Sequence, residues 1–179
     1  MKTIRNSVFE TNSSSMHSIS LTGKRVIKIP NYALDFECGE FGWKEESFAG
    51  SQSKLSYVLT AIQYYTEQPE YVVKPDNISW ADWEKHPDSI KYEKDCIDAV
   101  LNSKYLQWVK EILEDAGVLY YPKTLNISGD KYNRFGYIDH QSTDTLDEIW
   151  SSDEKEFKEN IKEFIFNPNW VLFTDNDNH

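Results

Sequence analysis

The sequence predicts an α+β fold: a mixed, mainly antiparallel sheet built from N- and C-terminal strands and packed by about four helices from the middle of the chain. Strand-like apolar segments occur at residues 3–9 and 18–29, and again at Trp170–Phe173. Helical periodicity is confined to the region between them. Because no internal repeat or composition shift divides the chain, we expect a single domain over residues 1–179.

The first elements are two strands on either side of a polar loop. Residues 3–9 are expected to form the first strand and residues 18–29 the second, with a hairpin turn at Thr22–Lys24 before Val26–Ile29. In residues 30–53 the apolar residues follow neither a helical nor a strand period, and glycines are interspersed among aromatic residues. Such a stretch is typical of a long, packed surface loop.

The middle of the chain carries the helical pattern. Apolar residues repeat at three- and four-residue spacing from Ser53 until Pro69 ends the pattern, and Tyr71–Val73 follows as a short strand. Further helical segments are predicted at Trp80–Trp83 (one turn), from near Asp88, over residues 106–116 with a left-handed C-cap at Gly117, and after a capping box of Ser151 and Glu154.

Short strands are predicted between and after the last helices. They cover Val118–Tyr121, Leu125–Ile127 and Phe135–Ile138, with a turn at Ser128–Asp130. Pro168 ends the last helix, and the run Trp170–Phe173 has the composition of a buried strand. A buried strand needs a neighbour on each side, so we expect it to share a sheet with the N-terminal strands.

Charge and composition exclude several classes of function. A net charge of −11 disfavours direct binding to DNA, RNA or anionic membranes, because each requires a cationic surface. The chain has no signal-peptide pattern and no apolar run of the roughly 18 residues that span a bilayer, so we expect a cytoplasmic protein. Cys38 and Cys96 form no CxxC pair, and we predict no metal and no cofactor.

A loop rich in hydroxyl groups lies between the first two predicted strands. It combines five hydroxyls with a carboxamide and an imidazole over residues 11–18. A second polar cluster, Asp139–Ser142, follows another predicted strand, and a third lies at Asp175–Asp177. Loops at strand ends present functional groups on a rigid scaffold, and we predict that the first two clusters meet in one cleft.

The residue types in this cleft suggest either of two roles. Candidate catalytic residues are His17, Asp139 and His140, with a histidine as proton carrier and the aspartate orienting it. Candidate ligand-binding residues are Asn12, Ser13, Ser14, Ser15, Ser18, Gln141 and Ser142, whose hydroxyls and amides suit an anion. Purely structural Asx and Ser/Thr turns are the alternative, and the third cluster lacks the glycine and glutamate of a calcium loop.

The FETNSSSMHS string of residues 9–18, within the longer segment Ile4–Ser18, resembles the opening of a group of small uncharacterised proteins. The group occurs in bacteriophages and mobile elements of Gram-positive bacteria, and Gly136–Ser142 is similar to a second segment of it. The resemblance implies an accessory role inside an infected bacterial cell. It carries over no reaction and no catalytic residue.

Three functions follow as hypotheses. The first is a phage-type accessory protein whose hydroxyl- and histidine-rich pocket binds a small anionic, nucleotide-like ligand and counters host defence, with aromatic side chains as stacking surfaces. The second is a hydrolase or transferase using the histidines and Asp139 for acid–base chemistry. The third is an acidic inhibitor of a host protein that mimics nucleic acid, with the carboxylates of residues 144–163 on one face.

Overall fold

The computed structural model describes residues 16–21, 25–42, 46–127, 135–138 and 146–175. Within these ranges the chain forms seven strands and five helical segments, one of them a single turn. The strands pair both antiparallel and parallel, and the longer helices pack with them, so the predicted α+β class is confirmed. No helix in this described part combines the length and the apolarity that a bilayer crossing needs.

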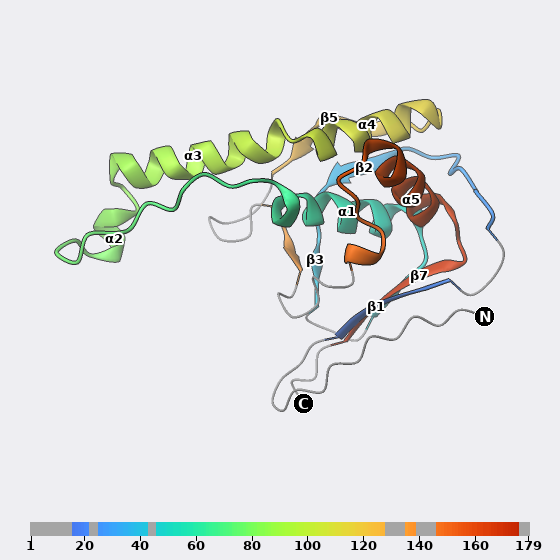
Figure 1. Ribbon diagram of the computed structural model, residues 1–179, viewed down its shortest axis with the longest axis horizontal. Coiled ribbons are helices and arrows are strands. Elements are labelled where there is room, and N and C mark those ends of the chain that lie inside the picture. Colours follow the sequence, from blue (N-terminus) through green and yellow to red (C-terminus); the bar gives the residue numbers. More distant parts are fainter. Residues whose placement is uncertain (1–15, 22–24, 43–45, 128–134, 139–145, 176–179) are drawn as a thin grey trace.

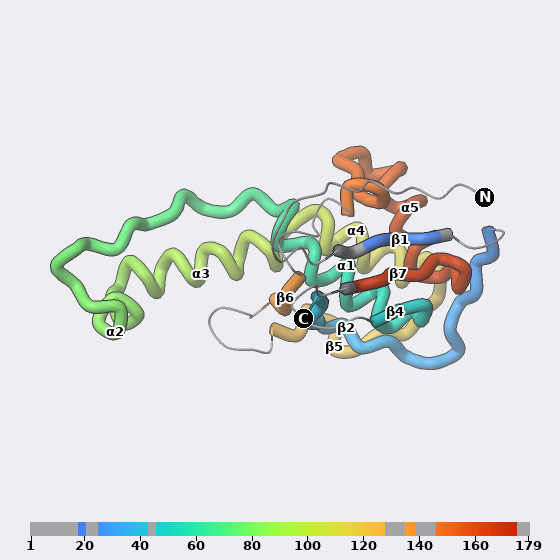
Figure 2. The backbone as a smooth tube through the Cα atoms, turned by 90° about the horizontal axis from the view of Figure 1, so that it is seen from below, coloured from blue at the N-terminus to red at the C-terminus, as the bar shows by residue number. Residues whose placement is uncertain are grey.

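The two ends of the chain share one sheet. Strands β1 (Met16–Leu21), β7 (Trp170–Asp175) and β4 (Glu46–Phe48) are antiparallel, with β7 in the centre, and β1 and β7 run side by side in Figures 1 and 2. Ile19 of β1 pairs with Leu172 of β7, and both side chains are buried. As predicted, the last strand has a neighbour on each side, but it is not buried along its length: Leu172 is buried, whereas Phe173 is 41% exposed.

Two short parallel pairs complete the strands. β2 (Leu34–Glu37) pairs with β5 (Tyr120–Asn126), and β3 (Glu40–Phe41) pairs with β6 (Tyr137–Ile138). The interpretation of residues 30–53 as an irregular loop was therefore wrong. β2 and β3 are too short to show a period, and their partners lie far along the chain.

Three other strand predictions also need correction. Residues 26–29 form no strand: their apolar side chains are exposed, and the backbone N–H of Lys28 donates instead to the carbonyl of Phe166 at 2.8 Å. Tyr71–Val73 is likewise exposed and outside any strand. The two strands predicted over residues 118–127 are one strand, β5. Its middle residues are exposed and not apolar enough to continue the pattern, so the sequence suggested a break there.

Helix α1 (Ser51–Tyr65) runs through the centre of the molecule (Figure 1). It contacts β2, β3, β6 and two helices, and residues 54–62 are all buried, polar side chains included. The ammonium group of Lys54 donates to the carbonyls of Asn167 (2.8 Å) and Trp170 (3.3 Å). These bonds tie α1 to the turn that precedes the central strand β7.

Helices α4 (Lys104–Asp115) and α5 (Glu154–Phe166) pack against each other and against α1. Gly117 follows α4 with φ +68°, as its predicted C-cap role requires. The predicted capping box of Ser151 and Glu154 was wrong by two residues. The N-cap of α5 is Asp153, whose carboxylate accepts from the backbone N–H of Glu156 at 2.9 Å.

An extension projects from this body, and we call it the arm: residues 66–79 together with α2 (Trp80–Trp83) and α3 (Pro87–Leu101). Figures 1 and 2 both show α2 and the outer part of α3 lying well away from the sheets and from the other helices. α3 buries only Ser89 and Val100. The N-cap of α3 is His86 rather than the predicted Asp88, since its imidazole accepts from the N–H of Asp88 at 3.3 Å.

Candidate functional site

Most of the predicted serine and histidine cleft lies outside the described residues. This applies to Asn12–Ser15 and to Asp139–Ser142, so their meeting in one cleft stays a prediction. Ser18 lies in β1 with an exposed side chain, and the backbone of His17 pairs with Thr174 of β7. β6, which precedes Asp139, pairs with β3 instead, so the strands next to the two clusters belong to different sheets.

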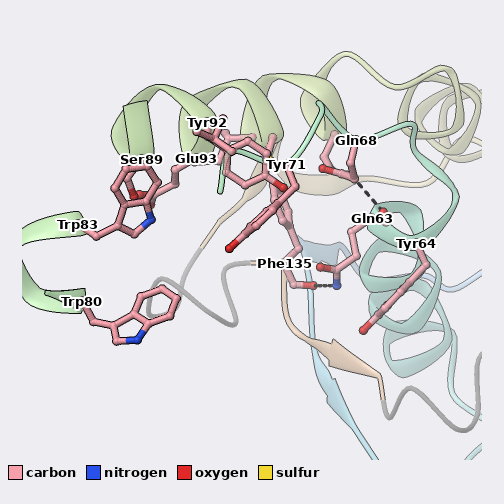
Figure 3. A pocket seen from close by; sticks show the side chains of 14 residues that line it. Gln63, Tyr64, Gln68, Tyr71, Trp80, Trp83, Ser89, Tyr92, Glu93 and Phe135 are labelled. Atoms are coloured by element: carbon pink, nitrogen blue, oxygen red, sulfur yellow. Dashed lines mark hydrogen bonds between the residues drawn. The ribbon is translucent and has the colours of Figure 1, made fainter. Parts of the chain in front are cut away.

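A different site is evident where the arm joins the body. A cavity of about 470 Å³ opens there between α1, the arm and Phe135 (Figure 3). This volume lies within the range of small-ligand sites, roughly 300–1,000 Å³. Its lining is mostly aromatic and aliphatic, with a few polar groups, and consists of Gln63, Tyr64, Gln68, Tyr71, Val72, Trp80, Trp83, Ser89, Tyr92, Glu93, Cys96, Ile97, Val100 and Phe135.

Aromatic rings form the outer part of this pocket. Tyr71 meets Tyr92 of α3 edge to face, with ring centroids 5.6 Å apart. Trp83 is buried and stacks on the imidazole of His86 at 5.1 Å, whereas Trp80 is 64% exposed. Large apolar rings that stay exposed on a soluble surface are costly, so a cluster of them around a cavity indicates a binding site.

Polar groups lie at the inner end, next to α1. Figure 3 shows the carboxamide of Gln63 beside Phe135 and that of Gln68 at some distance from it. The amide nitrogen of Gln63 donates to the carbonyls of Phe135 (3.2 Å) and Gly136 (3.4 Å), and that of Gln68 donates to the carbonyl of Gln63 (3.2 Å). These bonds also fix Phe135 as a wall of the pocket.

The electrostatics of the lining are neutral to negative. Glu93 is the one charged side chain among the described residues that line the pocket. Burial, followed by the hydrogen bond with Cys96, raises the pKa of Tyr92 and keeps its hydroxyl protonated at neutral pH. The ammonium group of Lys74 lies 5.3 Å from the ring centre of Trp80.

The described lining contains one carboxylate, that of Glu93, and no histidine. Within the described ranges, no group of three or more His, Cys, Asp or Glu residues is arranged to hold a metal ion. The family models, the curated proteins and the solved structures compared with the chain gave no match.

Sequence reasoning did not locate this pocket. The four aromatic residues of the arm, Tyr71, Trp80, Trp83 and Tyr92, are no denser than aromatic residues are in the chain as a whole, so they gave no clear signal. Gln63, Gln68 and Phe135 carried no signal, because only the fold brings them to the arm.

Proposed function

We propose that this protein is a phage-type accessory protein that binds a small nucleotide-like ligand, and that the pocket at the base of the arm holds the ring of that ligand. The observation that carries the proposal is the combination of tyrosine and tryptophan rings with carboxamides around one cavity of about 470 Å³. Rings supply stacking surface and carboxamides supply directional hydrogen bonds, which are the two contacts by which proteins hold a nucleobase.

The charge distribution determines how such a ligand would lie. Among the described residues, no lysine, arginine or histidine lines the cavity, so this part of the lining offers a phosphate group no counter-charge. Lys74 lies against the exposed Trp80 at the outer end. A base stacked on Trp80 therefore lies inside the cavity, while the ribose and phosphate remain at its outer edge, within reach of Lys74 and solvent.

Calorimetric titration of the intact protein with adenosine and cytidine monophosphates tests the proposal, with Trp80→Ala as the pocket variant. Stacking of a base on an aromatic ring contributes about 1–3 kcal/mol, so we expect affinity to fall roughly 5- to 150-fold. Trp80 is 64% exposed, so its loss should leave the fold intact.

Tyr32→Ala is the matched control, because Tyr32 is also aromatic and 54% exposed but does not line the pocket. It should bind like the unaltered protein. Absence of binding to every nucleotide tested, or equal binding by the two variants, would overturn the assignment of the ligand or of the pocket.

A further inference from the structure

We infer that the ligand of this pocket carries two bases, as a dinucleotide does, and that two separate groups of aromatic rings hold one base each. This inference rests on the proposed function and names the class of ligand for the same pocket. It depends on three features of the lining: the volume that it encloses, the separation of its rings, and the ring faces that remain open to the cavity.

The cavity is larger than a single base requires. Its volume is about 470 Å³. A nucleobase of about ten heavy atoms needs roughly 150 Å³ at the packing density of a protein interior. One base would therefore leave most of the cavity to water, and an apolar wall that stays in contact with water gains no hydrophobic stabilisation. A second ring system is needed to cover the rest of the lining.

The rings that line the cavity fall into two groups. Trp80 and Trp83 of α2 form the tryptophan group, and Tyr71 and Tyr92 form the tyrosine group. Figure 3 shows the two tryptophans on one side of the cavity, apart from Tyr71 and Phe135. The tyrosines contact each other, but no ring contact among the described residues joins them to the tryptophans. A single base therefore cannot stack on both groups at once.

In the tryptophan group, the surface that faces the cavity is open. The ammonium group of Lys74 lies 5.3 Å from the ring centre of Trp80, and the imidazole of His86 stacks on Trp83 at 5.1 Å. Neither Lys74 nor His86 lines the cavity, so the ring surface that they cover is not the surface that lines it. The tryptophan group thus offers uncovered indole surface to a base.

The tyrosine group offers a second stacking surface. Tyr71 is 61% exposed, and its ring meets that of Tyr92 at an interplanar angle of 89°. In such an edge-to-face pair only one face of one ring is covered, so the other flat faces stay available for stacking. Tyr71 is therefore the ring on which we place the second base.

A dinucleotide suits two separated ring groups, because its bases are joined through two riboses and one phosphodiester. Rotation about these bonds lets the bases part and stack on different side chains, as they do in proteins that bind single strands. The phosphodiester carries a single negative charge, which suits a lining without a described cation in a protein of net charge −11. Binding of the second base is then intramolecular and adds affinity without a second loss of translational freedom.

Calorimetric titration of the intact protein with the dinucleotide ApA tests the inference. The matched ligand is adenosine methyl phosphate, which has the same single charge but only one base. We expect ApA to bind roughly 5- to 150-fold more tightly, the gain that one further stacked base provides. Trp80→Ala and Tyr71→Ala should each abolish this preference, because each variant keeps only one of the two ring groups.

Tyr32→Ala is again the control, and it should keep the preference of the unaltered protein, because Tyr32 lies outside the lining. Equal binding of the two ligands by the unaltered protein would overturn the two-base inference and leave the proposed function standing. A preference that persists in Trp80→Ala or in Tyr71→Ala would also overturn it, because the second base would not depend on the ring group removed. If neither ligand binds, the inference fails, and the proposed function fails with it only if the mononucleotides do not bind either.

Discussion

Gly136 and Gly117 have nearly the same backbone conformation but opposite surroundings. Their φ angles are +70° and +68°, in the left-handed region that disfavours any side chain. A Cβ atom at Gly136 would lie 2.0 Å from the carbonyl oxygen of Gly39, whereas a Cβ at Gly117 would meet nothing within 4 Å. The pair of alanine variants therefore separates backbone strain from steric exclusion.

For Gly117→Ala the expected loss is small. The left-handed conformation costs an alanine about 1–2 kcal/mol, and the reduced entropy of the unfolded chain returns about 0.4–1 kcal/mol. We expect the free energy of unfolding to fall by about 1 kcal/mol. No packed atom has to move, since the space around the new methyl group is open.

For Gly136→Ala the same strain is joined by a collision with backbone. The new methyl group forces Gly39 and Gly136 apart, and Gly39 accepts the hydrogen bond from the N–H of Tyr137 at 2.9 Å. Stretching that bond disrupts the β3–β6 pair and leaves partly buried polar groups unpaired, which costs about 1–3 kcal/mol in addition. We expect a total loss of at least about 3 kcal/mol.

Urea unfolding followed by circular dichroism measures both losses, with the unaltered protein as reference. Nucleotide titration of Gly136→Ala adds a second readout, because Gln63 of the pocket donates to the carbonyl of Gly136. We expect weaker binding in this variant and unchanged binding in Gly117→Ala. Equal loss of stability in the two variants would show that the close approach of Gly136 to Gly39 does not contribute to the cost of a side chain at Gly136.

Two further predictions concern α1. Burial lowers the pKa of Lys54 from 10.5 to about 8, so between these values the unfolded chain binds the proton that the folded chain lacks. The free energy of unfolding of the unaltered protein, relative to that of Lys54→Met, should therefore rise between pH 8 and 10.5, by on the order of 2 kcal/mol after allowance for solvent screening. Urea unfolding of both proteins at pH 7.5 and at pH 10 measures this. The same difference between their midpoints at the two pH values would contradict the prediction. Thr60 is buried, and its hydroxyl accepts from the N–H of Gly39 at 2.8 Å. Thr60→Val should therefore lower the free energy of unfolding by about 1–3 kcal/mol. Thr66→Val, at the half-buried C-cap of the same helix, should lower it by less.

The candidate site illustrates how far the sequence could be used. Its hydroxyl and histidine clusters stood out because their residue types are unusual between apolar flanks, yet most of Asn12–Ser18 and all of Asp139–Ser142 lie outside the described residues. The arm pocket was not predicted, because its walls are separated in sequence: Gln63 lies in the last turn of the central helix, Gln68 and Trp80 belong to the arm, and Phe135 precedes β6.

The sequence by itself determined the helices of the body and the presence of the last strand. In those segments the side chains that face the core recur at a helical spacing or form one apolar run, as in α1 and in Trp170–Phe173, so each segment carries its own signal. Only the tertiary structure decided the parallel pairs β2–β5 and β3–β6 and the position of the arm against Gln63. These depend on strands of a few residues whose partners lie far along the chain, and on side chains that become neighbours only when α1 is enclosed, so no local pattern can encode them.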